Sequence, residues 1–135
     1  AYHYIGDPEQ YPYPGIHSIP NSTFELQLQH LSQTYYMPTP SEVEAFLFEG
    51  YVFERPGILL TFDDGLIDHY LVAAKFLTEN GISAAFFVST KPLTDSSVLA
   101  VHKAQWLRAN CDPELLRHEF FTLAERSMPI DNLTN

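Results

Sequence analysis

The chain has 135 residues, enough for one domain of ordinary size, and its apolar share of 45% predicts a packed core. Its 17 Asp and Glu residues against 7 Lys and Arg give a net charge of −10, which argues against nucleic acid and anionic membranes as partners. No segment is apolar enough to predict a membrane span, and the single Cys111 excludes an internal disulfide. Because no signal peptide is visible and only one thiol is present, the cytoplasm is slightly favoured.

The first third of the chain predicts a short strand, a loop and two helices. Residues 2–5 are typical of a strand, and the loop that follows is rich in proline. Ser22 and Glu25 have the spacing of a capping box at the start of a helix over 23–34. Ser41 and Glu44 have the same spacing and predict the start of a second, shorter helix.

The middle of the chain predicts a β-α-β unit. An apolar run at 57–62 lacks polar alternation, which indicates a strand covered on both faces. A second apolar run at 82–90 predicts the next strand, and Asn80-Gly81 ends the helix between them. We expect the two strands to be parallel and the crossover right-handed. The residues expected on the buried face of this helix are Ile67, Tyr70, Leu71, Ala74 and Leu77.

The last third of the chain predicts helices. The segment 95–127 is helical in pattern, with Asp112 and Pro113 as N-cap and first residue of its last helix. The tail at 128–135 has no core pattern, so we expect it to be frayed.

Two adjacent carboxylates, Asp63 and Asp64, follow the first apolar strand directly. Ligands in parallel α/β folds sit at the carboxyl ends of strands. Two neighbouring carboxylates repel each other, and a divalent cation, or a division of roles between base and ligand, would resolve that conflict. Gly65 then lets the chain turn without a Cβ in the way. The simpler interpretation is a polar turn before a helix N-terminus, where acidic residues are also favoured.

The sequence resembles the polysaccharide deacetylases, which include chitin, chitooligosaccharide and peptidoglycan deacetylases. The segment "LLTFDDG" at 59–65 resembles their first signature motif, "YHYI" at 2–5 their first strand, and "GISAAFFV" at 81–88 the strand after the signature helix. The resemblance covers roughly the first two-thirds of the chain. It implies an α/β fold, a distorted (β/α) barrel of which 135 residues would form only part, since a full barrel needs about 200 or more.

The same resemblance implies a function and roles for the two aspartates. Family members hydrolyse N-acetyl, or in some cases O-acetyl, groups on amino-sugar glycans with a divalent metal, often zinc. By resemblance, Asp63 is the general base and Asp64 a metal ligand. The metal would polarise the acetyl carbonyl and lower the pKa of its bound water.

The chain departs from the family pattern at its second motif, a pair of histidines in the form His-x-x-x-His. Only His102 stands near the expected place, with Trp106 where its partner would be, so His102 is a candidate ligand. Either the chain is the N-terminal part of a longer deacetylase domain, with 95–127 as a helical insertion, or it is a relative that has lost its metal. We favour the first interpretation, in which residues 1–135 form one domain.

Other features complete the set of candidates. His3 and His17, near the first strand and in the proline-rich loop, are candidate pocket residues, whereas His30 and His69, on helices, are expected to be surface or boundary residues. The alternative to an enzyme is a non-catalytic glycan-binding or structural remnant. A glycosidase that uses the two carboxylates is a third, remote hypothesis. Sheet edges left open by a partial barrel predict self-association.

Overall fold

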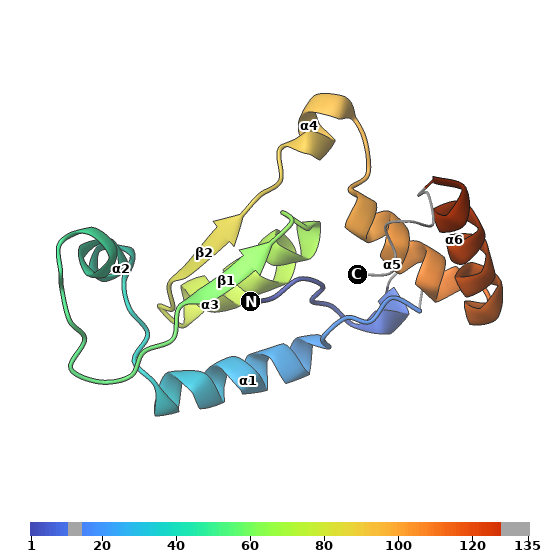
Figure 1. Cartoon of the computed structure of the whole chain (residues 1–135). Helices are drawn as coiled ribbons and strands as arrows, with labels where there is room; N and C mark the ends of the chain where they lie inside the picture. Colours follow the sequence, from blue (N-terminus) through green and yellow to red (C-terminus); the bar gives the residue numbers. More distant parts are fainter. Residues whose placement is uncertain (11–14, 128–135) are drawn as a thin grey trace.

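The computed structural model describes residues 1–10 and 15–127, and it shows a mixture of helices and strands around a small parallel sheet (Figure 1). The expected frayed tail at 128–135 lies outside the described residues. The elements in chain order are η1 (Pro8–Gln10), α1 (Asn21–Thr34), α2 (Pro40–Phe48), β1 (Leu60–Asp63), η2 (His69–Ala74), α3 (Lys75–Glu79), β2 (Ala84–Phe87), α4 (Lys91–Asp95), α5 (Ala100–Asn110) and α6 (Pro113–Ser127). None of the described helices is long and apolar enough to cross a membrane.

Strand β1 is hydrogen-bonded on both of its edges. On one edge it pairs in parallel with β2, in a register that runs from Leu60 opposite Ala84 to Asp63 opposite Phe87. On the other edge the Tyr2 N–H donates to the Thr61 carbonyl at 2.7 Å, and the Asp63 N–H donates to the Tyr2 carbonyl at 3.0 Å. The predicted parallel β-α-β unit is therefore confirmed, while the predicted strand at 2–5 is reduced to single bridges.

The core is an aromatic cluster centred on Phe62 of β1, which is fully buried. The ring of Tyr2 stacks on it at 5.4 Å between centroids, and the ring of Phe86 stacks on it at 4.8 Å. Phe24 of α1 meets both Tyr2 and Phe62 edge to face. Helix α1 runs alongside the sheet (Figure 1), and its buried Phe24 and Leu28 close this side of the core.

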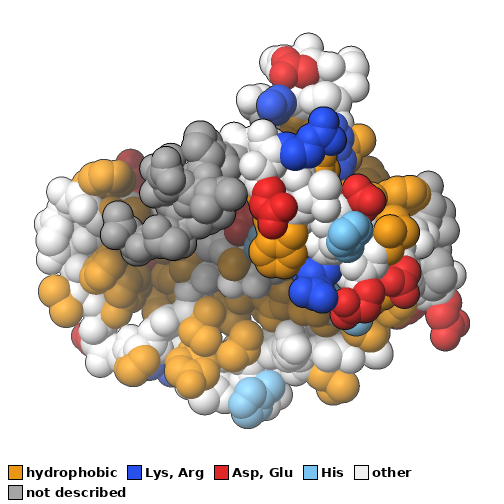
Figure 2. Space-filling view, turned by 45° about the vertical axis from the view of Figure 1, so that its right-hand side comes forward, with side chains coloured by type: hydrophobic (Ala, Val, Ile, Leu, Met, Phe, Trp, Pro, Cys, Tyr) orange, Lys and Arg blue, Asp and Glu red, His pale blue; other side chains and the backbone are white. Residues whose placement is uncertain are grey.

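The prediction that the first strand is covered on both faces was wrong, and β2, predicted as a second apolar strand, is half-buried to exposed. Along β1 buried residues alternate with half-buried ones, because helices α1 and α3 supply core residues to only one face. Leu59, Phe87 and Val88 are largely exposed among the described residues. An apolar run without polar alternation is typical of a strand covered on both faces, but here one face of the sheet stays open. Hydrophobic patches on one face of the molecule are visible in Figure 2.

The helix between the strands turns a different face to the core from the one predicted. Its first part, η2, is π-helical, and α3 continues it to Glu79, with Gly81 at φ +63° after its end. The expected core residues Ile67, Tyr70 and Leu71 are exposed. A π-helical turn holds more residues than the 3.6 of an α-helix, so a pattern taken at 3.6 assigns the wrong face. The residues that the helix buries are His69, Ala73 and Leu77.

The two capping boxes were predicted at the wrong residues. Helix α2 is capped by Thr39 and Glu42, whose side chains and backbone bond reciprocally, because Pro40 at the first helical position fixes the start there. Helix α1 begins at Asn21 without a side-chain cap on Pro20, and instead Asp7 accepts from the Asn21 N–H at 3.2 Å.

The last helices follow the sequence pattern more closely. The Asp112 carboxylate accepts from the N–H groups of Glu114 and Leu115 at 3.0 and 2.9 Å, which makes it the N-cap of α6 as predicted.

Both strands point toward the side of the molecule on which α5 lies (Figure 1). The carboxyl ends of the strands therefore face α5.

Helix α2 provides a direct test of the corrected cap. Thr39→Ala removes the hydroxyl that accepts the Glu42 N–H, so we expect a loss of about 1 kcal/mol in the free energy of unfolding, measured by urea titration. Ser41→Ala, at the residue that the sequence pattern favoured, is the matched control and should change stability by a few tenths of that amount. A larger loss for Ser41→Ala than for Thr39→Ala would contradict this cap.

The same cap should make the stability of the fold depend on pH. The hydrogen bond from the Tyr36 hydroxyl, with further bonds from Thr39, lowers the pKa of Glu42 below its ordinary value. A carboxylate with a lowered pKa stabilises the fold fully above its unfolded-state pKa, and this contribution is lost as the pH falls through the folded-state value. We therefore expect Glu42→Gln to be less stable than wild type at neutral pH, and the difference in free energy of unfolding to shrink as the pH falls below about 4. A difference that does not change with pH would contradict the hydrogen bond between Tyr36 and Glu42.

Candidate active site

The two carboxylates lie where the sequence predicts them, at the carboxyl end of β1. Asp63 is the last residue of the strand, and Asp64 follows in the left-handed region at φ 75°. This backbone conformation is uncommon for residues other than glycine and costs free energy, so it persists only where the surroundings enforce it. The turn directs the side chains of the two aspartates toward different histidines.

Gly65 completes this turn for two separate reasons. Its φ of +72° is in the region that favours glycine. In addition, a Cβ at this position would lie 2.6 Å from a methyl carbon of Val88, which follows β2. The turn that carries Asp64 is thus packed against the neighbouring strand.

Asp63 faces His3. The His3 Nε2 and the Asp63 Oδ2 are 3.7 Å apart, and both side chains are partly open to solvent. The backbone of His3 is held from behind by His69, whose Nε2 lies 2.6 Å from the His3 carbonyl oxygen. His69 is only 4% exposed, so the prediction that it is a surface or boundary residue was wrong. The face that η2 turns inward explains the error.

Asp64 faces His102, which comes from α5. The His102 Nε2 is 4.0 Å from the Asp64 Oδ2, and both side chains are about four-fifths buried. The other ring nitrogen, Nδ1, lies 2.5 Å from the Tyr4 hydroxyl, and the two rings meet edge to face. Burial, and secondly the negative charges of Asp64 and Asp68, raise the pKa of Tyr4. Tyr4 thereby fixes the ring of His102 with its Nε2 toward Asp64.

The remaining candidates gather around a hollow of about 270 Å³ beside Asp64. His3 and His17, both predicted as pocket residues, line it together with Tyr4 and Gln105. Sequence reasoning missed Tyr4, Gln105 and the role of His69. The bond between Tyr4 and His102 joins residues 98 positions apart, so no local pattern in the sequence indicates it.

The donors at Asp64 and His102 suit zinc, which binds carboxylate oxygen and imidazole nitrogen. Their separation of 4.0 Å is close to the value of about 3.3 Å for two donors on one tetrahedral ion. Within residues 1–10 and 15–127, however, no group of three or more His, Cys, Asp or Glu side chains could hold a metal ion. A catalytic zinc takes roughly three protein ligands, so Asp64 and His102 would not by themselves complete such a site.

The turn after β1 can be tested with a pair of glycines. Gly65→Ala incurs the cost of positive φ and the overlap with Val88, whereas Gly50→Ala, at φ +76°, meets nothing within 4 Å. We expect Gly50→Ala to cost about 1 kcal/mol of unfolding free energy and Gly65→Ala about 1–3 kcal/mol more. Thermal unfolding measures both. Equal losses would show that Val88 does not pack on the turn, and Val88→Ala should restore part of the loss in Gly65→Ala.

Comparisons with known proteins support the resemblance seen in the sequence. No protein-family model and no curated protein matches the chain. Among solved structures, IcaB from Ammonifex degensii is similar, with 31% sequence identity and a TM-score of 0.54 over 64% of this chain. The Streptococcus pyogenes deacetylase PplD, solved in complex with acetate, is similar with 26% identity and a TM-score of 0.54 over 76% of this chain.

The chain spans less than half of the length of either neighbour. The chain covers 35% of the length of IcaB and 47% of the length of PplD. On the side of the present chain, the similarity extends over most of the residues, with 31% identity to IcaB and 26% to PplD. The resemblance of this chain to the polysaccharide deacetylases, first seen in its Thr-Phe-Asp-Asp-Gly motif, is thereby confirmed for the part that these structures cover.

Proposed function

We propose that this chain takes part in the hydrolysis of acetyl groups, at C–N amide or ester bonds, on an amino-sugar-containing glycan. The observation that carries the proposal is the pair of carboxylates at the end of β1, each facing its own histidine. A deacetylase among the structural neighbours supports this broad reaction class. The substrate glycan comes from the family resemblance.

Asp63 is suited to act as the general base. It is the more open of the two aspartates, with a side chain 36% exposed, so its Oδ2 can take a proton from an attacking water. The His3 imidazole lies 3.7 Å from the carboxylate, and His69 holds the backbone of His3 in place. The surroundings of Asp63 are therefore linked through His3 to the buried His69 in the core.

Asp64 and His102 are suited to hold a divalent cation, zinc above all, with the remaining protein ligand outside the described residues. A bound zinc would polarise the acetyl carbonyl and lower the pKa of a water molecule. Tyr4 supports this role, since a hydrogen bond at one nitrogen of a histidine orients the other nitrogen toward a ligand. The parallel sheet would be one part of the family's distorted barrel, with 1–135 as the N-terminal part of the domain and 95–127 as an insertion.

The second candidate function is non-catalytic glycan binding by a remnant that lacks a complete metal site. The observation that favours it is the missing group of three ligands among the described residues. Trp106 stands one helical turn after His102, where a family histidine would stand, and an aromatic ring suits a sugar better than a metal. Metal binding separates the two functions.

Zinc affinity is the first test. By calorimetry we expect one site in the wild-type chain, weakened at least about tenfold in both Asp64→Ala and His102→Ala. His30→Ala, an exposed histidine on α1, is the matched control and should bind as wild type does. Absence of a zinc site in the wild-type chain would overturn the metal proposal for this chain and favour the non-catalytic function.

Acetate release from an acetylated chitooligosaccharide tests the reaction itself. We expect Asp63→Asn to lower the rate by about 10²–10⁴-fold, because removal of a general base has effects of this size. Asp95→Asn, at the end of α4, is the isosteric control and should leave the rate unchanged. If zinc binds but Asp63→Asn retains full activity, Asp63 is not the base.

We also propose that the open side of the sheet mediates self-association. Leu59, Phe87 and Val88 expose apolar surface next to β2, which has no strand beyond it among the described residues. Phe87→Lys should shift light scattering toward monomer, and Phe48→Lys, an exposed residue of α2, should not. A wild-type chain that is monomeric at high concentration would contradict the proposal.

A further inference from the structure

A second, larger cavity of about 620 Å³ adjoins the site. Its walls come from the segment 15–17 and from α5 and α6. His17 and Gln105 line both this cavity and the hollow beside Asp64, so the two spaces meet at these side chains. Its size is in the range typical of ligand pockets. No role in the proposed reaction requires this space.

The walls of the cavity are held together by close packing. The backbone at Gly15 lies so near α5 that a Cβ there would be 2.6 Å from the Ala109 carbonyl oxygen. Helix α6 starts directly after α5, at the corner where Asp112 caps it with two hydrogen bonds. The contact at Gly15 holds the segment 15–17 against α5, and the Asp112 cap, two residues after the end of α5, fixes the start of α6.

The lining of the cavity combines an apolar wall with positive charge. Leu107, Leu116 and Phe120 supply apolar surface. Two arginines, Arg108 of α5 and Arg117 of α6, are the charged side chains among the described lining residues, in a chain whose net charge is −10. Charge of one sign gathered in a cavity attracts ligands of the opposite sign.

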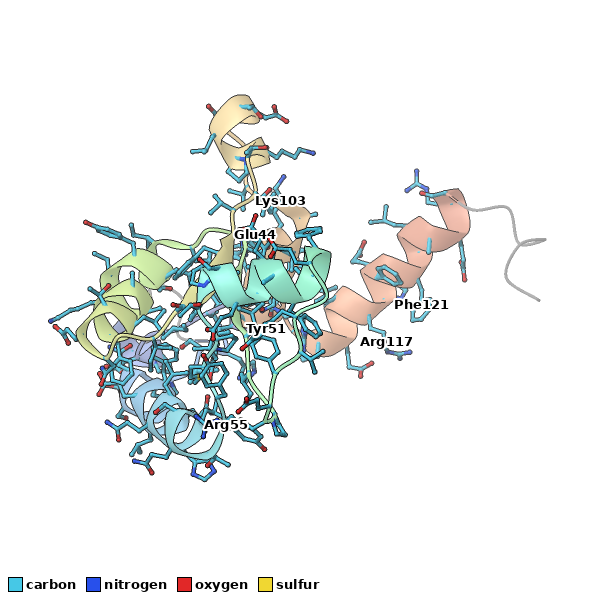
Figure 3. The ribbon with its side chains drawn as sticks, turned by 90° about the vertical axis from the view of Figure 1, so that its left-hand side faces the viewer. Glu44, Tyr51, Arg55, Lys103, Arg117 and Phe121 are labelled. Carbon is cyan, nitrogen blue, oxygen red and sulfur yellow. The ribbon has the colours of Figure 1, made fainter. Side chains whose placement is uncertain are left out.

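The two arginines differ in how far they are neutralised. Arg117 donates from Nε and Nη2 to one carboxylate oxygen of Glu114, at 3.2 and 3.1 Å, so part of its charge is compensated. Arg108 forms no ion pair within the described part of the chain. Figure 3 shows Arg117 on α6. Arg108 is therefore the stronger site for an anion.

We infer that this cavity binds an acidic sugar residue of the glycan, one that carries a carboxylate or a phosphate. A guanidinium binds either group through paired hydrogen bonds. The apolar wall, including the exposed ring of Phe120, would contact the apolar face of the sugar ring. The inference rests on the proposed function: with the acetylated sugar in the hollow beside Asp64, its neighbour in the glycan would lie across Gln105, which lines both spaces.

The test compares three disaccharides by chemical-shift titration of the whole chain. The first is neutral N,N′-diacetylchitobiose, the second is N-acetylglucosaminyl-N-acetylmuramic acid, which adds a carboxylate, and the third is diacetylchitobiose 6-phosphate. We expect at least one anionic disaccharide to bind about fivefold or more tightly than the neutral one, with shifts in α5 and α6. The preference should shrink at high salt, and the better of the two anions identifies the acidic group.

Two variants assign the preference to the cavity. Arg108→Gln should reduce the affinity for the anion to that of the neutral disaccharide. Arg126→Gln, in the last turn of α6 and not in the cavity lining, is the matched control and should keep the preference. Arg117→Gln should have a smaller effect than Arg108→Gln, because Glu114 already compensates Arg117.

Three results would overturn the inference: equal affinity for neutral and anionic disaccharides, a preference that survives Arg108→Gln, or no shifts in α5 and α6 with any of the three. Acetate release is measured separately on the same disaccharides. Release without an anion preference contradicts only the inference about the cavity. An anion preference without release contradicts the proposed hydrolysis and leaves the binding site in place.

Discussion

The position of β1, hydrogen-bonded on both edges, is the constraint on which the rest of the structure depends. Tyr2 on one side and β2 on the other hold the strand, and Phe62 anchors it in the aromatic core. Because the strand cannot shift along either neighbour, the residue after Phe62 must emerge at its carboxyl end beside the segment that carries His3. The location of the site therefore follows from strand pairing, and the left-handed turn at Asp64 then separates the two carboxylates.

His69 connects this core to the site. Its Nε2 lies 2.6 Å from a carbonyl oxygen, which can only accept, so this nitrogen carries the proton. Its Nδ1 is buried with no hydrogen-bond partner among the described residues. The imidazole packs against the rings of Phe62 and Phe86 while its Nε2 holds the backbone of His3. Packing in the core in this way sets the geometry around Asp63.

The sequence was sufficient for three features that depend on residues close together in the chain. The end of β1, the stop after α3 and the Asp112 cap all follow from local chemistry, and the parallel pairing follows from the length of the crossover. It was insufficient where distant residues decide: Asp7 takes over at the start of α1, and the π-helical turn rotates the helix so that His69 faces inward. Tyr4 and His102 meet only because α5 returns to the carboxyl end of the sheet.

Helix α5 shows how one element can serve two spaces at once. At 3.6 residues per turn, successive residues are rotated by about 100°, which places Gln105 between His102 on one side and Arg108 on the other. His102 faces Asp64, Arg108 faces the large cavity, and Gln105 lines both spaces. A rotation of α5 large enough to improve contacts in one space would therefore remove a residue from the other. Gly15 packed against Ala109 and the bond from Tyr4 to His102 oppose such a rotation from two sides. A ligand long enough to cross Gln105 would bind both spaces along a single rigid helix, with little reorganisation of the protein.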